Sequence, residues 1–198
     1  MVNENSTQSE QPTPNNRPPF WQLGIVFVVV AAVTFGVMAL SNNQAPQDET
    51  NGVARAVSAV NSPAPNFESV FLNGDEVQLS DFRGRLVFLN FWATWCTPCR
   101  RELPAFEEFM AEQGEDGPII LAVNVEESPE VITMFFENIG VENIPVILDE
   151  SGDISNLYTV FNLPVTYVID AEGIIRSIKL GETKITDLYD YVDQLSAD

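Results

Sequence analysis

One short segment constrains the fold of this 198-residue chain more than any other, because an apolar stretch runs directly into two closely spaced cysteines. Residues 86–92 are apolar except for Asn90, which is the pattern of a strand buried on both faces of a sheet. The motif Cys96-Thr97-Pro98-Cys99 follows, and residues 98–113 then carry apolar side chains at helical spacing. This order predicts a helix that begins at the cysteines and packs on the sheet.

The rest of the chain after residue 62 repeats this alternation of strands and helices. Ser128 and Pro129 mark the start of a second helix, and Gly140 marks its end. Turn residues at 73–75 and 170–173 indicate two hairpins. We therefore predict an α/β fold with a sheet covered on both faces. Its strands are expected at 67–71, 77–79, 86–92, 119–125, 146–148, 165–169 and 174–180, and its helices at 98–113, 129–139, 154–160 and 185–195.

The two cysteines have the spacing of a redox pair. A thiol at a helix N-terminus faces unpaired N–H groups and the positive end of the helix dipole, so we expect the pKa of Cys96 to lie below the free value of about 8.5. Cys99 lies one turn further on, close enough to attack a mixed disulfide on Cys96 and form a reversible bridge. A structural disulfide and half of a metal site are the alternatives. So short a loop constrains little of the chain, which makes it a poor structural cross-link.

Composition excludes several other classes of site. The chain has two cysteines and no histidine, too few for a zinc site built from four Cys or His ligands. A nucleophile paired with histidine is impossible for the same reason. The net charge of −20, from 29 acidic and 9 basic residues, argues against a nucleic-acid partner. We expect no metal and no other cofactor, and thiol–disulfide exchange is the predicted chemistry.

The segment from Asn90 to Pro104, NFWATWCTPCRRELP, resembles the active-site segment of a known family. The family is the TlpA/ResA/CcmG group of membrane-anchored thioredoxin-like proteins, in the AhpC/TSA-redoxin superfamily. Residues 64–67 and 79–84 resemble its entry segment and the loop before its first core strand. The resemblance implies a thioredoxin-like fold with an N-terminal β-hairpin and a central strand–helix insertion at 119–139. It also implies a protein thiol–disulfide oxidoreductase that reduces client proteins, with apocytochrome c as one client class and a membrane thiol donor as reductant.

The same resemblance assigns roles to single residues. Cys96 corresponds to the exposed nucleophile and Cys99 to the buried resolving thiol. Glu102 corresponds to an active-site glutamate that accepts or relays a thiol proton, and its alternative is a surface glutamate paired with Arg100 or Arg101. Asn90 stands where ordinary thioredoxins carry a buried aspartate, and an amide cannot titrate. The residues expected to line the site or contact substrate are Trp95, Thr97, Pro98, Leu163 and Pro164, the last two in a loop that resembles the cis-proline loop of thioredoxins.

Two other activities remain open at this point. One is a thiol peroxidase of the redoxin superfamily, which needs a threonine three residues before its peroxidatic cysteine, whereas Thr94 is two before Cys96. The other is a non-enzymatic copper-delivery module of similar fold, which uses a wider cysteine spacing and a histidine. Peroxide consumption and copper titration distinguish these activities from disulfide exchange.

The N-terminal part of the chain contains a candidate membrane anchor. Residues 23–40 form an 18-residue apolar run without charge, which as a helix reaches about 27 Å and nearly spans the hydrocarbon core. We predict a transmembrane anchor at 20–40, uncleaved rather than a signal peptide, because Arg17 is the only basic residue before it. The positive-inside rule then keeps the N-terminus cytoplasmic. Residues 1–19 are predicted to be a disordered cytoplasmic tail, 41–61 a flexible linker and 62–198 an extracytoplasmic thioredoxin-like domain.

Overall fold

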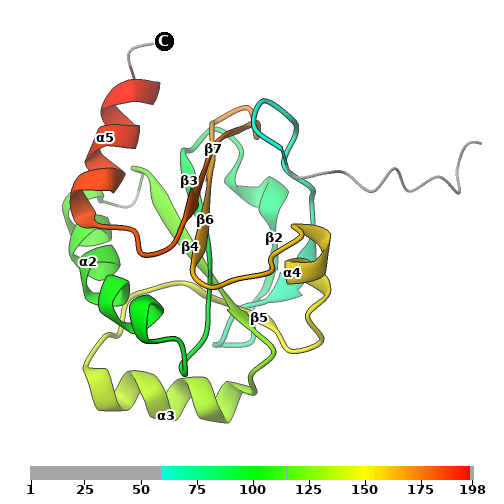
Figure 1. Cartoon of the computed structure of the whole chain (residues 1–198), viewed down its shortest axis with the longest axis vertical. Helices are drawn as coiled ribbons and strands as arrows, with labels where there is room; N and C mark the ends of the chain where they lie inside the picture. Colours follow the sequence, from blue (N-terminus) through cyan, green and yellow to red (C-terminus); the bar gives the residue numbers. More distant parts are fainter. Residues whose placement is uncertain (1–58, 115, 197–198) are drawn as a thin grey trace, which may run out of the picture. The chain divides into compact units, whose positions relative to one another are not determined.

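The computed structural model describes residues 59–114 and 116–196, which form a five-stranded sheet with helices and a small hairpin packed against it (Figure 1). The strands are β1 (Glu68–Val70), β2 (Glu76–Gln78), β3 (Val87–Trp92), β4 (Ile119–Val125), β5 (Val146–Asp149), β6 (Val165–Ile169) and β7 (Ile175–Leu180). The helices are the 3-10 helix η1 (Leu79–Phe82) and α2 (Thr97–Gln113), α3 (Pro129–Ile139), α4 (Asp153–Leu157) and α5 (Ile185–Leu195). The predicted α/β class is confirmed.

The main sheet has the strand order β5-β4-β3-β6-β7, with β3 at its centre. β3, β4 and β5 are parallel to one another, whereas β6 is antiparallel to β3 and β7 is antiparallel to β6. Every residue of β3 is buried, as the apolar run predicts. The strand and helix expected at 119–139 are present as β4 and α3. β4 is an interior strand between β3 and β5, and β5 forms the edge of the sheet.

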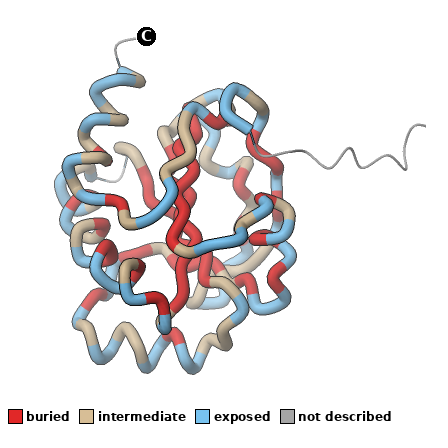
Figure 2. Tube along the Cα trace, in the orientation of Figure 1, coloured by how far each residue is buried: buried red, intermediate tan, exposed pale blue. Residues whose placement is uncertain are grey.

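The two faces of the sheet carry separate apolar clusters because side chains alternate along each strand. Val87, Leu89 and Phe91 of β3 pack with residues of the β1–β2 hairpin and α4. Phe88 and Trp92 point to the opposite face and pack with α2, α3 and α5. Figure 2 shows the buried residues concentrated along the central strands, with exposed residues on the outer sides of the helices. Asn90 has the same parity as Phe88 and Trp92, so it lies on the face covered by α2.

Local sequence signals explain most element boundaries. Pro98 lies in the first turn of α2, where its missing N–H has no helical partner to lose. α3 begins at Pro129 after the N-cap Ser128, and Gly140 ends it in the left-handed conformation, as predicted. The helix predicted at 154–160 is shorter than expected. It ends at Leu157, and Thr159 adopts a positive φ of 60°, which an α-helix cannot contain.

The N-terminal hairpin is confirmed, since β1 and β2 pair antiparallel around the turn at Asn73–Asp75. The predicted tail at 1–19, the anchor at 20–40 and most of the linker lie outside the described residues. Among the helices of residues 59–114 and 116–196, none is long and apolar enough to cross a bilayer.

Candidate active site

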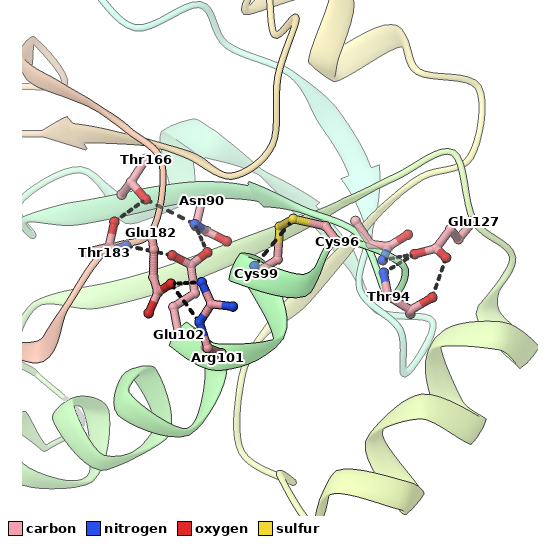
Figure 3. The surroundings of a disulfide bond; sticks show 11 residues. Asn90, Thr94, Cys96, Cys99, Arg101, Glu102, Glu127, Thr166, Glu182 and Thr183 are labelled. Carbon is pink, nitrogen blue, oxygen red and sulfur yellow. Dashed lines mark hydrogen bonds and ion pairs between the residues drawn. A yellow bond between two sulfur atoms is a disulfide. The ribbon is translucent and has the colours of Figure 1, made fainter.

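A disulfide joins Cys96 and Cys99 at the N-terminus of α2, with their Cα atoms 5.3 Å apart (Figure 3). Cys96 is the N-cap residue, and its Sγ accepts a hydrogen bond from the Cys99 backbone N–H at 3.3 Å. Cys99 is fully buried, whereas Cys96 keeps a small exposed fraction and the adjacent Trp95 is 70% exposed. Cys96 is thus largely buried, which corrects the exposed nucleophile that the resemblance implies, and the helix N-terminus favours negative charge on its sulfur.

Glu102 lies one turn after Cys99 on α2 and is buried. Its Oε1 accepts a hydrogen bond from Asn90 Nδ2 at 2.9 Å, and its Oε2 accepts one from the Thr183 backbone N–H at 2.8 Å. Burial raises the pKa of Glu102 from 4.5 to about 7, and the two hydrogen bonds oppose this rise. The carboxyl group can therefore hold or release a proton close to neutral pH. It is not the surface glutamate of the alternative prediction.

The two arginines that follow Cys99 are engaged elsewhere. Arg101 donates to Glu182, the residue before Thr183, through Nε at 2.9 Å and through its terminal nitrogen. The Arg100 guanidinium carbon lies 5.5 Å from the centre of the Phe135 ring. Neither side chain forms an ion pair with Glu102, although Glu182 contributes to the raised pKa of Glu102 through its negative charge.

A buried polar network continues from Glu102 into the sheet. Asn90 Nδ2 also donates to Thr166 Oγ1 at 3.0 Å, and the hydroxyls of Thr166 and Thr183 lie 3.1 Å apart. Asn90 and Thr166 are direct partners in the β3–β6 register. Sequence reasoning missed Thr166 and Thr183, because only strand pairing and the β7–α5 connection bring them to Glu102.

A second carboxylate holds the loop that leads into Cys96 (Figure 3). Glu127, in the connection between β4 and α3, accepts hydrogen bonds from Thr94 N–H at 2.7 Å and Thr94 Oγ1 at 2.5 Å. Asn124 Nδ2, at the end of β4, donates to the same carboxylate at 2.9 Å. Sequence reasoning missed this cluster as well. The available signal was the run of polar residues at 126–128, directly after a buried strand.

The loop before β6 lies near the same core. The peptide bond between Leu163 and Pro164 is cis. Pro164 is buried, and the half-buried Leu163 packs against the apolar cluster that contains both cysteines. A surface hollow beside this loop is lined by Phe161, Leu163, Pro164 and Leu180, and Phe161 and Leu180 are highly exposed.

The remaining predicted lining residues lie on the first turn of α2, where Thr97 is exposed and Pro98 is half-buried. Cys96, Cys99 and Glu102 thus follow one another at three-residue intervals from the N-cap of α2, and all three are buried. Within residues 59–114 and 116–196, no group of three or more His, Cys, Asp or Glu side chains is placed to hold a metal ion.

Comparisons with known proteins point to the same chemistry. The family model described as "AhpC/TSA family" matches residues 60–178. A thiol-disulfide oxidoreductase ResA from Geobacillus kaustophilus (strain HTA426) is 39% identical over 137 residues, covering 69% of this chain and 78% of the relative. Another from Oceanobacillus iheyensis is 33% identical and covers 98% of this chain and 97% of the relative. The crystal structure of a pneumococcal exposed lipoprotein thioredoxin from Streptococcus pneumoniae strain TIGR4 is similar, with a TM-score of 0.60, 29% identity and coverage of 66% and 99%.

A thioredoxin-like sheet with a CxxC disulfide at a helix N-terminus defines a class of enzyme, the protein thiol–disulfide oxidoreductases. The named relatives place the chain in this class. The chain belongs to the AhpC/TSA family, in which it is similar to the ResA oxidoreductases.

Proposed function

We propose that this protein reduces disulfides in client proteins outside the cytoplasm, with Cys96 as the attacking thiolate and Cys99 as the resolving thiol. The observation that carries the proposal is the asymmetry of the disulfide. Cys96 Sγ caps α2 and the residue keeps 4% of its surface exposed beside the exposed Trp95, whereas Cys99 is fully buried on the helix that carries Glu102, an acid whose pKa is near neutrality.

The reaction proceeds in two exchanges. The Cys96 thiolate attacks one sulfur of a client disulfide, forms a mixed disulfide and releases the other client sulfur as a thiolate. Cys99 then loses its proton and attacks the Cys96 sulfur. The mixed disulfide breaks, the second client sulfur leaves as a thiolate, and the Cys96–Cys99 disulfide forms. Two electrons have passed to the client, whose two sulfurs take up protons.

Glu102 is the proposed proton carrier for Cys99. As a carboxylate it accepts the thiol proton when Cys99 attacks, and as a carboxylic acid it returns a proton when the disulfide is reduced again. A pKa near 7 suits both directions, because proton transfer is efficient when the pKa lies close to the working pH. The chain has no third cysteine, so an external dithiol must restore the reduced state.

The site also argues against the peroxidase alternative. The Thr94 hydroxyl donates its hydrogen to Glu127 at 2.5 Å, so it is already committed within the loop before Cys96. Disulfide exchange needs no hydroxyl at this position. Peroxide consumption by the reduced protein remains the direct measurement for that alternative.

The proposed location is the outer face of the cell membrane, with the N-terminus in the cytoplasm and residues 20–40 as the anchor. The uncharged apolar run at 23–40 supports it. The proposed clients are proteins with accessible disulfides, apocytochrome c among them, and the proposed donor is a membrane thiol reductant. Both partners rest on the resemblance to the TlpA/ResA/CcmG group.

Trapping tests the direction of attack and the clients together. Full-length protein with Cys99→Ala, produced in the source organism, is expected to accumulate mixed disulfides on Cys96 that separate on non-reducing gels. The matched control, with Cys96→Ala added, removes the attacking sulfur and should trap nothing. Absence of any trapped protein in the Cys99→Ala strain contradicts the proposal.

Labelling tests the location separately. A membrane-impermeant maleimide applied to intact cells should modify Cys96 in the Cys99→Ala protein without lysis. Modification only after lysis places the domain in the cytoplasm and overturns the proposed topology.

A further inference from the structure

Asn90 contains a buried polar atom that the site leaves without a partner. The residue is fully buried in β3, and Nδ2 uses its two hydrogens on Glu102 and Thr166. Its Oδ1 accepts no hydrogen bond from the residues that the structure describes. Buried carbonyl oxygens rarely lack a donor, because the group has given up its bonds to water. A donor is therefore expected here in another state of the site.

The amide is oriented by its contacts. Cys99 and Glu102 are three residues apart on α2, so their side chains lie on the same face of the helix, above β3. Asn90 turns its nitrogen toward Glu102, and its oxygen then faces the other neighbour. Figure 3 shows the oxygen end of the Asn90 amide pointing toward Cys99.

Reduction of the disulfide creates a donor at that neighbour. In the oxidised site the Cys99 sulfur carries no hydrogen. A dithiol that reduces the site becomes a disulfide itself and transfers two electrons and two protons, leaving a thiol on Cys96 and another on Cys99. The Cys99 thiol is buried, and a thiol is a weak hydrogen-bond donor that needs an acceptor within the protein.

We propose that Asn90 Oδ1 accepts a hydrogen bond from the Cys99 thiol in the reduced protein. Asn90 then joins Cys99 to Glu102 through the two ends of one amide. The bond stabilises Cys99 in its protonated form, so that Cys96 is the sulfur that ionises first. The other titratable groups facing this pair are Cys96 and Glu102 on α2, with Glu182 held by Arg101 in the β7–α5 connection. The inference rests on the proposed dithiol chemistry.

The infrared S–H stretch of Cys99 tests the contact directly. In a Cys96→Ala background Cys99 is the only thiol of the chain, and its band should have the lowered frequency of a hydrogen-bonded thiol. Asn90→Leu should move the band to the frequency of a free thiol. Thr166→Val is the matched control, because it removes a contact to the amide nitrogen and should leave the band in place. A band that is unchanged by Asn90→Leu overturns the inference.

A second variant covers the case in which Asn90→Leu fails to fold. Asn90→Asp keeps an oxygen on the Cys99 side, and as a carboxylic acid it can still donate to Glu102, so the S–H band should keep its lowered frequency. The frequency of a free thiol in this variant also overturns the inference.

The redox equilibrium gives an independent measure in the protein with both cysteines. Losing the bond destabilises the reduced state, so Asn90→Leu should shift the equilibrium with dithiothreitol about two- to tenfold toward the disulfide. The same shift in Thr166→Val counts against the inference. A protein that shows the lowered S–H frequency but reduces no client disulfide would overturn the proposed function. The hydrogen bond between Cys99 and Asn90 would still be supported.

Discussion

Two glutamates flank the disulfide, and the structure uses them differently. Glu102 is buried under α2 and accepts one hydrogen bond on each oxygen, from Asn90 and from the Thr183 backbone. Glu127 is half-buried and accepts three hydrogen bonds, two of them from Thr94. Removal from water makes the first group a store for a proton. The donors around the second group fix the loop that precedes Cys96. One glutamate thus has the surroundings that the proposed proton transfer needs, and the other holds a loop in place.

The largest expected effect is on the rate of disulfide reduction, which should depend on Glu102 far more than on Glu127. Glu102→Gln should slow the reduction of the Cys96–Cys99 disulfide by a dithiol about 100-fold at pH 6, because the leaving Cys99 thiolate loses its proton donor. The difference from wild type should shrink above pH 8, where Glu102 is ionised. Glu127→Gln should change the rate much less. Stopped-flow tryptophan fluorescence measures these rates, and an equal deficit at every pH excludes proton donation by Glu102.

The second effect concerns stability against pH. The pKa of Glu102 is higher in the folded state than in the unfolded state, so the folded state holds this proton more tightly. The resulting stability is fully present below the unfolded-state pKa and is lost as the pH rises through the folded-state pKa near 7. A rise from 4.5 to about 7 corresponds to about 3 kcal/mol. Between pH 4.5 and 8 the oxidised wild type should lose this free energy of unfolding relative to Glu102→Gln. Glu127→Gln should keep the wild-type pH dependence. Urea titrations at several pH values measure the free energy of unfolding. The same pH dependence in wild type and Glu102→Gln would contradict the prediction.

The third effect is the stability contributed by the hydrogen bond between Thr94 and Glu127. Thr94→Val removes one hydrogen bond to a carboxylate and should lower the free energy of unfolding by about 1.5–3 kcal/mol. The loss should be the same at pH 5 and pH 8, because it does not involve Glu102. Thermal and urea unfolding provide the measurement. A loss of unfolding free energy at only one of the two pH values would show that the Thr94–Glu127 hydrogen bond depends on the titration of Glu102.

The smallest expected effect is on the pKa of Glu102, through the charges of its neighbours. The charge of Glu182 adds to the raised pKa of Glu102, and Arg101 pairs with Glu182. Glu182→Gln should therefore lower the pKa of Glu102, while Arg101→Gln should raise it. Titration of the Glu102 side-chain carbonyl carbon by nuclear magnetic resonance measures both shifts. Shifts of the same sign would show that the loop acts through its conformation rather than its charge.

The sequence predicts most of the fold because its signals are local. The apolar run at 86–92 gives the central strand, and Ser128, Pro129 and Gly140 bound α3. The end of α4 is predicted too far along the chain, because an apolar pattern does not reveal the positive φ of Thr159. Strand order is likewise absent from the pattern, and so the interior place of β4 was not foreseen.

The candidate site divides in the same way. Cys96, Cys99 and Glu102 lie close together in sequence at the start of one helix, so their spacing selects the two cysteines and the family resemblance adds Glu102. The proton affinity of Glu102 is not local, because Thr183, which lies 81 residues further on, closes over it. Glu127 and Thr94 are 33 residues apart and meet only when β4 lies beside β3.

The closure of the β7–α5 connection over Glu102 has a consequence for the timing of activity during biogenesis. The two cysteines are three residues apart and can meet in a chain that has not yet folded. The buried acid exists only after the last strand and helix have docked, since Thr183 lies between them. A nascent chain can therefore acquire its disulfide early, yet it gains its acid group only on completing the domain. The disulfide and the buried acid beside it are therefore expected to form at different stages of folding.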